Sequence, residues 1–112
     1  MSLREEQEAF TRDVVRLLTY IMANGMTVTL GEVMRTADQQ KLYVQTGRST
    51  TMNSYHLKKL AIDLNIFKNG RLLLDQGSLK HVGDFWCQQD PKNQWGGNWK
   101  SFKDLPHFER RA

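Results

Sequence analysis

The stretch from Leu60 to Phe67 constrains the fold most strongly, because its residue types alternate strictly. Every second residue is aliphatic and the residues between are small or polar, which is the period of a strand with one buried face. Asn69-Gly70 follows, the dipeptide most typical of a two-residue hairpin turn, and Arg71–Asp75 is predicted to return as a second strand. The sequence therefore predicts an antiparallel hairpin at the centre of the fold. Its aliphatic face consists of Leu60, Ile62, Leu64 and Ile66.

Helical periodicity surrounds this hairpin. Apolar residues at helical spacing predict a helix from about Ser2 to Ala23, which Gly25 ends. Thr36 is predicted to cap a second helix over about Ala37–Thr46. Ser78 is predicted to cap a third helix. The apolar face of this third helix consists of Leu79, Val82, Phe85 and Trp86.

The remaining segments complete the predicted architecture. Alternation from Met26 predicts another strand, bulged at Gly31 and continuing to Arg35. The segments 47–55 and 90–104 are predicted to be loops, and 105–110 a short final strand. The sequence thus predicts an α+β fold, in which residues 1–112 form a single domain with helices packed on a small, mostly antiparallel sheet.

Composition limits the classes of function. The 112 residues suffice for one modest core, and no apolar run approaches the length of a membrane-spanning helix. The single cysteine, Cys87, excludes an internal disulfide. A net charge of +4 favours polyanionic partners such as nucleic acid, an anionic membrane or a cell envelope. The basic residues form no single block and no nucleic-acid motif is present, so we expect no nucleic-acid partner, with a basic nucleic-acid-binding domain as the alternative. We also expect a monomer that does not insert stably into membranes.

Asp63 lies within the alternating strand but not on its aliphatic face. Side chains alternate between the two faces of a strand, so Ala61, Asp63 and Asn65 are predicted to share the second face. Antiparallel sheets often leave one face in water, and a solvated Asp63 is one interpretation of this pattern. The other interpretation is a binding site on that face.

Two of the three histidines are candidates to join Asp63. His56 precedes the Asp63 strand and His107 lies near the end of the chain, whereas His81 lies on the polar side of the third predicted helix and is expected to be solvated. Two imidazoles and one carboxylate are the three-ligand set of a catalytic zinc, which keeps a fourth position for water. Spacing alone does not show that these three side chains meet. Surface histidines, or histidines hydrogen-bonded in the core, are the alternative.

Asp104 lies three residues before His107. Pro106 disfavours helix at Leu105, so this segment is predicted to form a turn or an extended bend. A carboxylate held beside a metal ligand, but not bound to the metal, can accept the proton of a metal-activated water. The alternative is an ordinary solvated aspartate in a turn.

Three segments together resemble the D-alanyl-D-alanine metallopeptidase family. This family includes bacterial D-Ala-D-Ala carboxypeptidases and phage L-alanyl-D-glutamate endolysins, and it shares its fold with the Hedgehog signalling domain. SYHLKKLAID (54–63) is similar to the family's Ser-x-His-x(6)-Asp motif. WGGNWKSFKDLPHFE (95–109) is similar to its Trp-Gly-Gly stretch running into Asp-x-x-His-Phe, and VMRTADQQKLY (33–43) to its upstream strand and helix. Lys59 departs from the pattern, since the family often has glycine there.

The resemblance implies a role for each matching residue. His56, Asp63 and His107 would bind one Zn²⁺. Asp104 would act as general base and then as the acid that protonates the leaving amine. Arg35 would stabilise the oxyanion or bind a substrate carbonyl.

The resemblance also implies roles around the metal. Ser54 would position substrate or order the His56 loop. Trp95 and Trp99 would either wall the cleft or pack in the core, and both interpretations stay open at this point. Gln39 and Gln40 are interpreted as surface residues of the second helix.

The function implied is hydrolysis of an amide bond in the peptidoglycan stem peptide. Asp-x-Pro-His-Phe is most similar to the endolysin branch, which favours an L-alanyl-D-glutamate endopeptidase. A carboxypeptidase would need a second cation besides Arg35 for the substrate's terminal carboxylate. The alternatives are a D-Ala-D-Ala carboxypeptidase and a Hedgehog-like zinc domain without activity. With no secretory signal recognised, the protein is expected to be made in the cytoplasm and to act on the cell wall after release.

Overall fold

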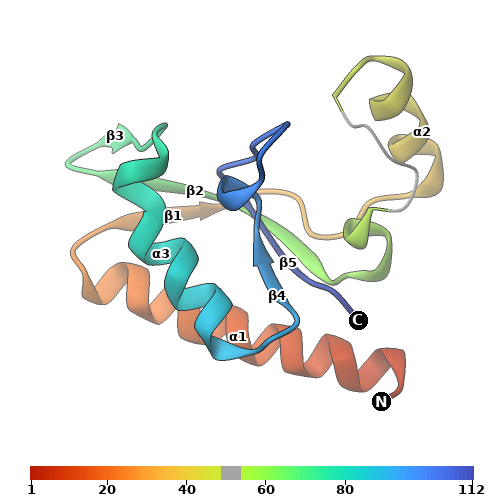
Figure 1. Cartoon of the computed structure of the whole chain (residues 1–112), viewed down its shortest axis with the longest axis horizontal. Helices are drawn as coiled ribbons and strands as arrows, with labels where there is room; N and C mark the ends of the chain where they lie inside the picture. Colours follow the sequence, from red (N-terminus) through yellow and green to blue (C-terminus); the bar gives the residue numbers. More distant parts are fainter. Residues whose placement is uncertain (49–53) are drawn as a thin grey trace.

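The structure, a computed structural model, describes residues 1–48 and 54–112 (Figure 1). The helices are α1 (Leu3–Ala23), α2 (Ala37–Gln45) and α3 (Gln76–Gln89), with short 3₁₀ helices at Tyr55–Lys58 and Gly96–Asn98. The strands are β1 (Thr27–Leu30), β2 (Ala61–Lys68), β3 (Arg71–Leu72), β4 (Asn93–Trp95) and β5 (His107–Arg110).

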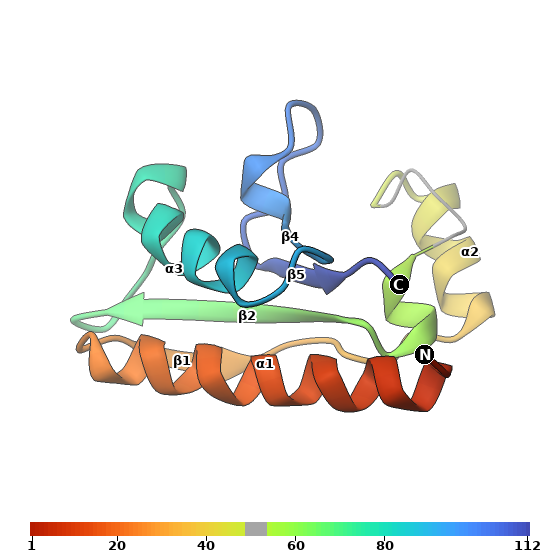
Figure 2. The ribbon, with the colours of Figure 1, turned by 60° about the horizontal axis from the view of Figure 1, so that its bottom comes forward.

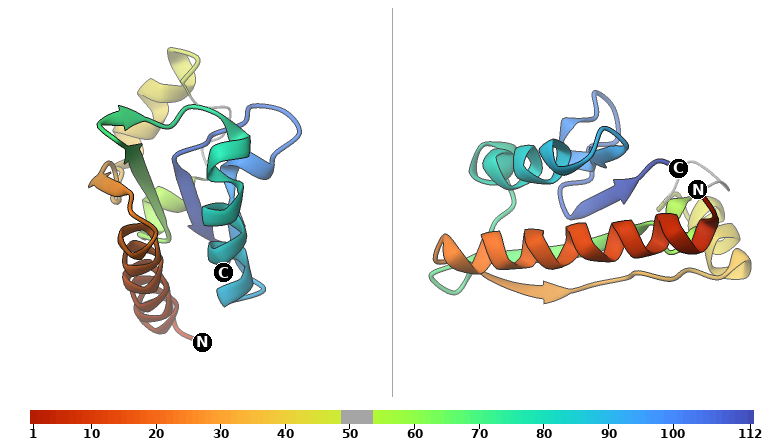
Figure 3. Two further views of the ribbon diagram at one scale, coloured as in Figure 1. Left: turned by 90° about the vertical axis from the view of Figure 1, so that its left-hand side faces the viewer. Right: turned by 90° about the horizontal axis from the view of Figure 1, so that it is seen from below.

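The strands form one antiparallel sheet in the order β1-β2-β5-β4, and β3 pairs with the C-terminal end of β2. β2 is the longest strand and runs through the middle of the molecule (Figure 2). α1 and α3 pack together on one face of the sheet, while α2 lies away from them (Figures 1 and 3). This arrangement confirms the predicted α+β class.

The core lies between the sheet and these two helices. The four predicted aliphatic residues of the β2 segment are all less than 5% exposed, as the alternation required. Burying each such side chain contributes about 1.5–3 kcal/mol. The indole of Trp86 meets the rings of Phe10 and Phe108 edge-on, at centroid distances of 5.6 and 6.1 Å. One face of β2 is therefore fixed in the core, which leaves its second face for other uses.

The predicted helix starts are confirmed at two of three helices. Ser2 caps α1 through a full capping box, and the Thr36 hydroxyl accepts from the backbone of Gln39 at the start of α2. The assignment of Ser78 as the third cap is wrong. Asp75 caps α3, because its carboxylate reaches the backbone N–H of Ser78 at 2.9 Å.

The predicted strand from Met26 to Arg35 is too long, since β1 ends at Leu30. Beyond it the chain still runs beside β2: the Gly31 N–H donates to the Asp63 carbonyl at 2.7 Å. A Cβ at Gly31 would lie 3.0 Å from the Cβ of Asp63, so any other residue here would require its neighbours to shift. The return strand of the hairpin is shorter than predicted: β3 ends at Leu72, and Asp75 caps α3 instead of extending the strand.

Two further outcomes concern the loops. The strand β4 was not predicted, since its three residues show no alternation. The predicted loop 47–55 lies partly outside the described residues, and Tyr55 begins a 3₁₀ helix. Within the described part of the chain, no helix is both long enough and apolar enough to cross a bilayer.

Candidate metal centre and cleft

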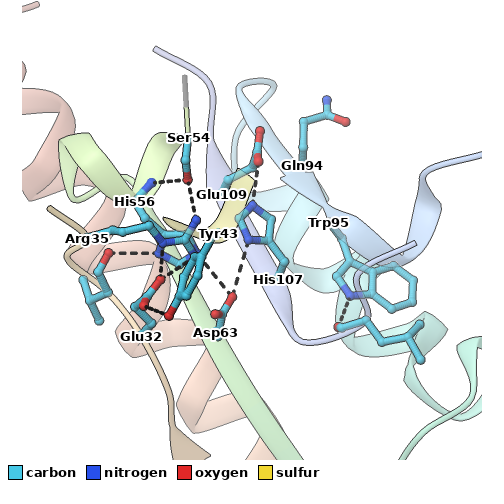
Figure 4. A network of polar contacts seen from close by, with 12 residues as sticks. Glu32, Arg35, Tyr43, Ser54, His56, Asp63, Gln94, Trp95, His107 and Glu109 are labelled. Atoms are coloured by element: carbon cyan, nitrogen blue, oxygen red, sulfur yellow. Dashed lines mark hydrogen bonds and ion pairs between the residues drawn. The ribbon is translucent and has the colours of Figure 1, made fainter. Parts of the chain in front are cut away.

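Pairing of β2 with β5 brings two candidate ligands together. Asp63 and His107 are directly opposite each other in the antiparallel register. The 3₁₀ helix just before β2 adds His56, and Figure 4 shows the three side chains converging. Asp63 Oδ1 lies 3.4 Å from His56 Nε2 and 3.4 Å from His107 Nδ1. One ligand atom from each residue lies within 4.8 Å of the others, a grouping that can hold one metal ion.

Hydrogen bonds fix which nitrogen each histidine presents. His56 Nδ1 lies 3.0 Å from the Val33 carbonyl, which can only accept, so Nδ1 carries the hydrogen and Nε2 is left for a ligand. His107 Nε2 lies 2.6 Å from a carboxylate oxygen of Glu109, which leaves Nδ1 facing Asp63. Histidine ligands of metals are usually held in this way through their second nitrogen.

Unsatisfied buried atoms indicate what the cluster lacks. Among the described residues, His56 Nε2 and Asp63 Oδ1 are buried without a hydrogen-bond partner. Buried polar atoms are rarely left unpaired in folded proteins. Both atoms face the point where a cation would complete their bonding, so the residues present fit a metal ion.

The charges of the cluster agree with this. Burial alone would raise the pKa of Asp63, but the imidazoles of His107 and His56, each with a nitrogen 3.4 Å from Oδ1, lower it to about 2. Burial alone would lower the pKa of His107, but the carboxylates of Asp63 and Glu109 raise it to about 9. The carboxylate is therefore ionised at neutral pH, and in the metal-free protein the proton on His107 takes the place of a cation.

Asp104 lies beside the cluster and is held by its backbone. Its N–H donates to the Gly96 carbonyl at 3.0 Å, and its own carbonyl accepts from the His107 N–H at 3.1 Å. A Cβ at Gly96 would lie 2.2 Å from the Asp104 carbonyl oxygen, so glycine is required for this contact. Burial raises the pKa of the Asp104 carboxyl. A carboxylate with a raised pKa is suited to exchange protons near neutral pH.

Arg35 is held on the other side of His56 by a dense set of partners (Figure 4). Its guanidinium forms an ion pair with Glu32 and hydrogen bonds to Gln40 and Ser54, and it stacks over the Tyr43 ring at 4.6 Å. The interpretation of Gln40 as a surface residue is wrong. Its side chain is fully buried, because it reaches inward from α2 to Arg35.

Ser54 connects Arg35 with His56. Its hydroxyl accepts from the backbone N–H of His56 at 3.2 Å and from the Arg35 guanidinium at 3.3 Å. This contact orders the start of the 3₁₀ helix that carries His56.

A cleft of about 740 Å³ opens over the cluster. Trp99 lines it, with its ring 5.2 Å from the ring of His107. The suggestion that Trp95 also walls the cleft is wrong, because this residue is fully buried in the core and its indole N–H donates to the Leu105 carbonyl. His81 is exposed, as predicted, and bonds to the Tyr20 hydroxyl.

Sequence reasoning missed two residues of the site. Glu109 is two positions after His107, and this spacing on a strand places both side chains on one face, which was a usable signal. Glu32 is three positions before Arg35, but no periodic pattern marks it as a partner. Both carboxylates hold residues of the site in place.

Comparisons with known proteins identify the family of the chain. Residues 47–110 match the model of a family described as D-alanyl-D-alanine carboxypeptidase. The chain is 35% identical over 97 residues to the L-alanyl-D-glutamate peptidase of Listeria phage A118, a match covering 84% of this chain and 34% of that protein. It is 32% identical over 103 residues to the peptidoglycan L-alanyl-D-glutamate endopeptidase CwlK of Bacillus subtilis (strain 168), covering 76% of this chain and 61% of CwlK. The chain thus spans about a third and about three fifths of the length of these curated relatives.

The fold has a counterpart among solved structures. The L-Ala D-Glu endopeptidase ChiX of Serratia marcescens superposes with a TM-score of 0.70 at 24% identity, covering 96% of this chain and 84% of that one. At this identity the match shows a shared fold. The family model covers more than half of the chain, including His56, Asp63, Asp104 and His107. The resemblance is therefore confirmed, and the chain belongs to the D-alanyl-D-alanine metallopeptidase family.

Proposed function

We propose that this protein is a zinc peptidase that hydrolyses the L-alanyl-D-glutamate bond of the peptidoglycan stem peptide. The observation that carries the proposal is the cluster of His56, Asp63 and His107 at the floor of a cleft, with Asp104 beside it. Two relatives named for the L-alanyl-D-glutamate bond support the substrate. The choice of zinc rests on the donor set, because two imidazoles and one carboxylate are typical of catalytic zinc.

The residues divide the chemical work between them. His56 Nε2, Asp63 Oδ1 and His107 Nδ1 would hold the metal, which when bound supplies a Lewis acid and lowers the pKa of water. Asp104 takes the proton from the attacking water and delivers it to the departing nitrogen. Arg35 donates to the oxygen on which negative charge develops. Arg35 is suited to this role because its protein partners fix its orientation in advance.

Two residues are proposed to contact or position the substrate. Ser54 orders the loop that carries His56 and keeps Arg35 in place. Trp99 is proposed to contact the peptide, since it lies in the wall of the cleft beside His107.

We also propose that residues 1–112 act as one monomeric catalytic domain that reaches the cell wall after release from the cytoplasm. The single hydrophobic core supports one domain. The net charge of +4 supports contact with an anionic wall.

The test is digestion of purified peptidoglycan by the zinc-loaded protein, with the fragments identified by mass spectrometry. We expect stem peptides with new D-glutamate amino termini, with no such products after chelation and their formation about 100-fold slower or more with Asp104→Asn. Release of free D-alanine from intact L-alanyl-D-glutamate linkages would identify a D-Ala-D-Ala carboxypeptidase instead. Zinc binding without any new fragment would identify an inactive zinc-binding domain.

A further inference from the structure

The cleft carries more positive charge than the proposed reaction uses. Two carboxylates line it, those of Asp104 and Glu109. Its cationic residues are Arg35, Arg48, Lys100, Lys103 and Arg111. An anionic group of a ligand would therefore be drawn into this cleft.

Arg111 differs from the other cations in how it is held. Its Nε donates to Glu109 Oε2 at 2.6 Å, and the same carboxylate bonds to His107 through Oε1 at 2.6 Å. Arg111 is thus tied to a candidate metal ligand through one buried residue. Its side chain is nevertheless 50% exposed and lines the cleft.

The guanidinium of Arg111 is anchored at one edge only. Within residues 1–48 and 54–112, its side chain bonds to Glu109 through Nε, and its terminal nitrogens have no ion-pair partner. Two terminal nitrogens on a planar group match the two oxygens of a carboxylate. Arg35 differs, because Glu32, Gln40 and Ser54 bind its guanidinium at Nε and at both terminal nitrogens, so it cannot offer two terminal nitrogens together to a carboxylate.

The remaining cations lack an anchoring carboxylate. Arg48, Lys100 and Lys103 are exposed, and none of them forms an ion pair with a residue that the structure describes, although Arg48 lies over the Tyr43 ring at 5.3 Å. A long exposed side chain loses rotamer freedom when it binds a ligand, whereas one fixed in advance loses less. Arg111 is therefore the cation of the cleft that is best prepared to bind a carboxylate.

We propose that Arg111 binds the free carboxylate of the substrate that lies nearest the scissile bond. The inference rests on the proposed function and deepens it. A glutamate residue within a peptide uses one carboxyl group in the next amide and keeps the other free, whereas alanine within a peptide has none. In the alternative carboxypeptidase reaction, the nearest carboxylate is the terminal one of D-alanine. The recognised group is a carboxylate in both cases.

The test compares peptides that differ in this carboxylate alone. One pair contains L-Ala-D-Glu with the glutamate carboxylate free or converted to the carboxamide, and a second pair ends in D-Ala-D-Ala as the free acid or the amide. A hydrogen bond to a charged group contributes about 1.5–3 kcal/mol, so we expect the wild type to prefer the free acid by about 10- to 100-fold in kcat/KM. The pair that shows the preference identifies the source of the carboxylate.

Arg111→Gln should reduce this preference to nearly onefold. Arg111→Lys, which keeps the charge but loses the planar fork, should retain part of it. Lys100→Gln and Lys103→Gln remove the same charge from the same cleft and should keep the full preference. Each preference is a ratio of kcat/KM values for two substrates of the same variant. A partial loss of activity or of zinc lowers both values equally and leaves this ratio unchanged.

Binding gives a readout that does not depend on turnover. Calorimetric titration with a product peptide that begins with D-glutamate should show tighter binding of the acid than of its amide, and Arg111→Gln should abolish this difference. An undiminished preference for the acid in Arg111→Gln would overturn the proposal. If the wild type cleaves neither pair of peptides, the proposed function is wrong. If it cleaves a pair but Arg111→Gln leaves the preference for the acid unchanged, only the role of Arg111 is wrong.

Discussion

Replacing Glu109 with glutamine should weaken zinc binding while leaving the chain folded. Glu109 is 4% exposed and bonds to His107 Nε2 at 2.6 Å. Glutamine keeps the shape and a neutral acceptor but loses the charge that holds the imidazole with Nδ1 toward the metal. The charged part of such a hydrogen bond is worth about 1–3 kcal/mol. We therefore expect zinc affinity to fall by about 10- to 100-fold.

The assay is competition for zinc between the protein and a chromophoric chelator, with folding followed by circular dichroism. Glu6→Gln is the matched control. Glu6 is also a buried carboxylate, 5% exposed, but it pairs with Arg110 at 2.6 Å on the other face of β5. This control should lower the free energy of unfolding and leave zinc affinity unchanged. Equal zinc affinity in Glu109→Gln and the wild type would refute the reasoning.

Three further predictions follow from the same geometry. Asp104→Asn should keep its zinc while turnover falls about 100-fold or more, because the amide cannot accept a proton; loss of zinc in this variant would make Asp104 a ligand. Gly96→Ala should destabilise the fold by about 1–3 kcal/mol and displace Asp104, because the new Cβ would lie 2.2 Å from the Asp104 carbonyl oxygen. Gly77→Ala is the tolerated control, since its Cβ would have no neighbour closer than 3.4 Å. Equal unfolding midpoints for Gly96→Ala and the wild type would argue against the contact. Zinc must displace the proton of His107, whose pKa hydrogen bonds raise to about 9 against the effect of burial. Zinc affinity should therefore rise about tenfold per pH unit from pH 7 to 9 and level off above, and a flat profile in the competition assay would contradict this.

The parts of the fold that depend on local pattern could be predicted from the sequence. Alternation fixed which residues of β2 enter the core, and it placed Asp63 on the opposite face. The helical spacing of apolar residues predicted α1, and four of these residues, Phe10, Val14, Leu17 and Ile21, are buried in the core. Both patterns involve residues close in the chain, so a short stretch of sequence contains each pattern in full.

The parts that depend on distant pairing could not be predicted without the family resemblance. Asp63 and His107 are 44 positions apart, and only the register of β2 with β5 places them opposite each other. Trp95 is another such case. A Cβ at Gly83 would lie 2.1 Å from its ring, so the indole packs directly on the backbone of α3. No spacing around Trp95 indicates that a glycine of another element makes this room.

The buried polar partners form a third group. Gln40 looked like a surface residue because α2 has little apolar periodicity, yet its amide holds Arg35 from inside. Its burial depends on where the segment after β1 brings Arg35, which the helix pattern alone does not encode. Functional sites often break the local rules that predict the rest of a fold in this way.

The most direct test of the account is the metal content of the purified protein and its ligand variants. Elemental analysis after removal of all metal and reloading with zinc should give one zinc per chain for the wild type. His56→Ala, Asp63→Ala and His107→Ala should each retain far less, while His81→Ala, a histidine outside the site, should retain the full amount. Full zinc occupancy in all three ligand variants would contradict the assignment of the metal centre, and with it the proposed reaction.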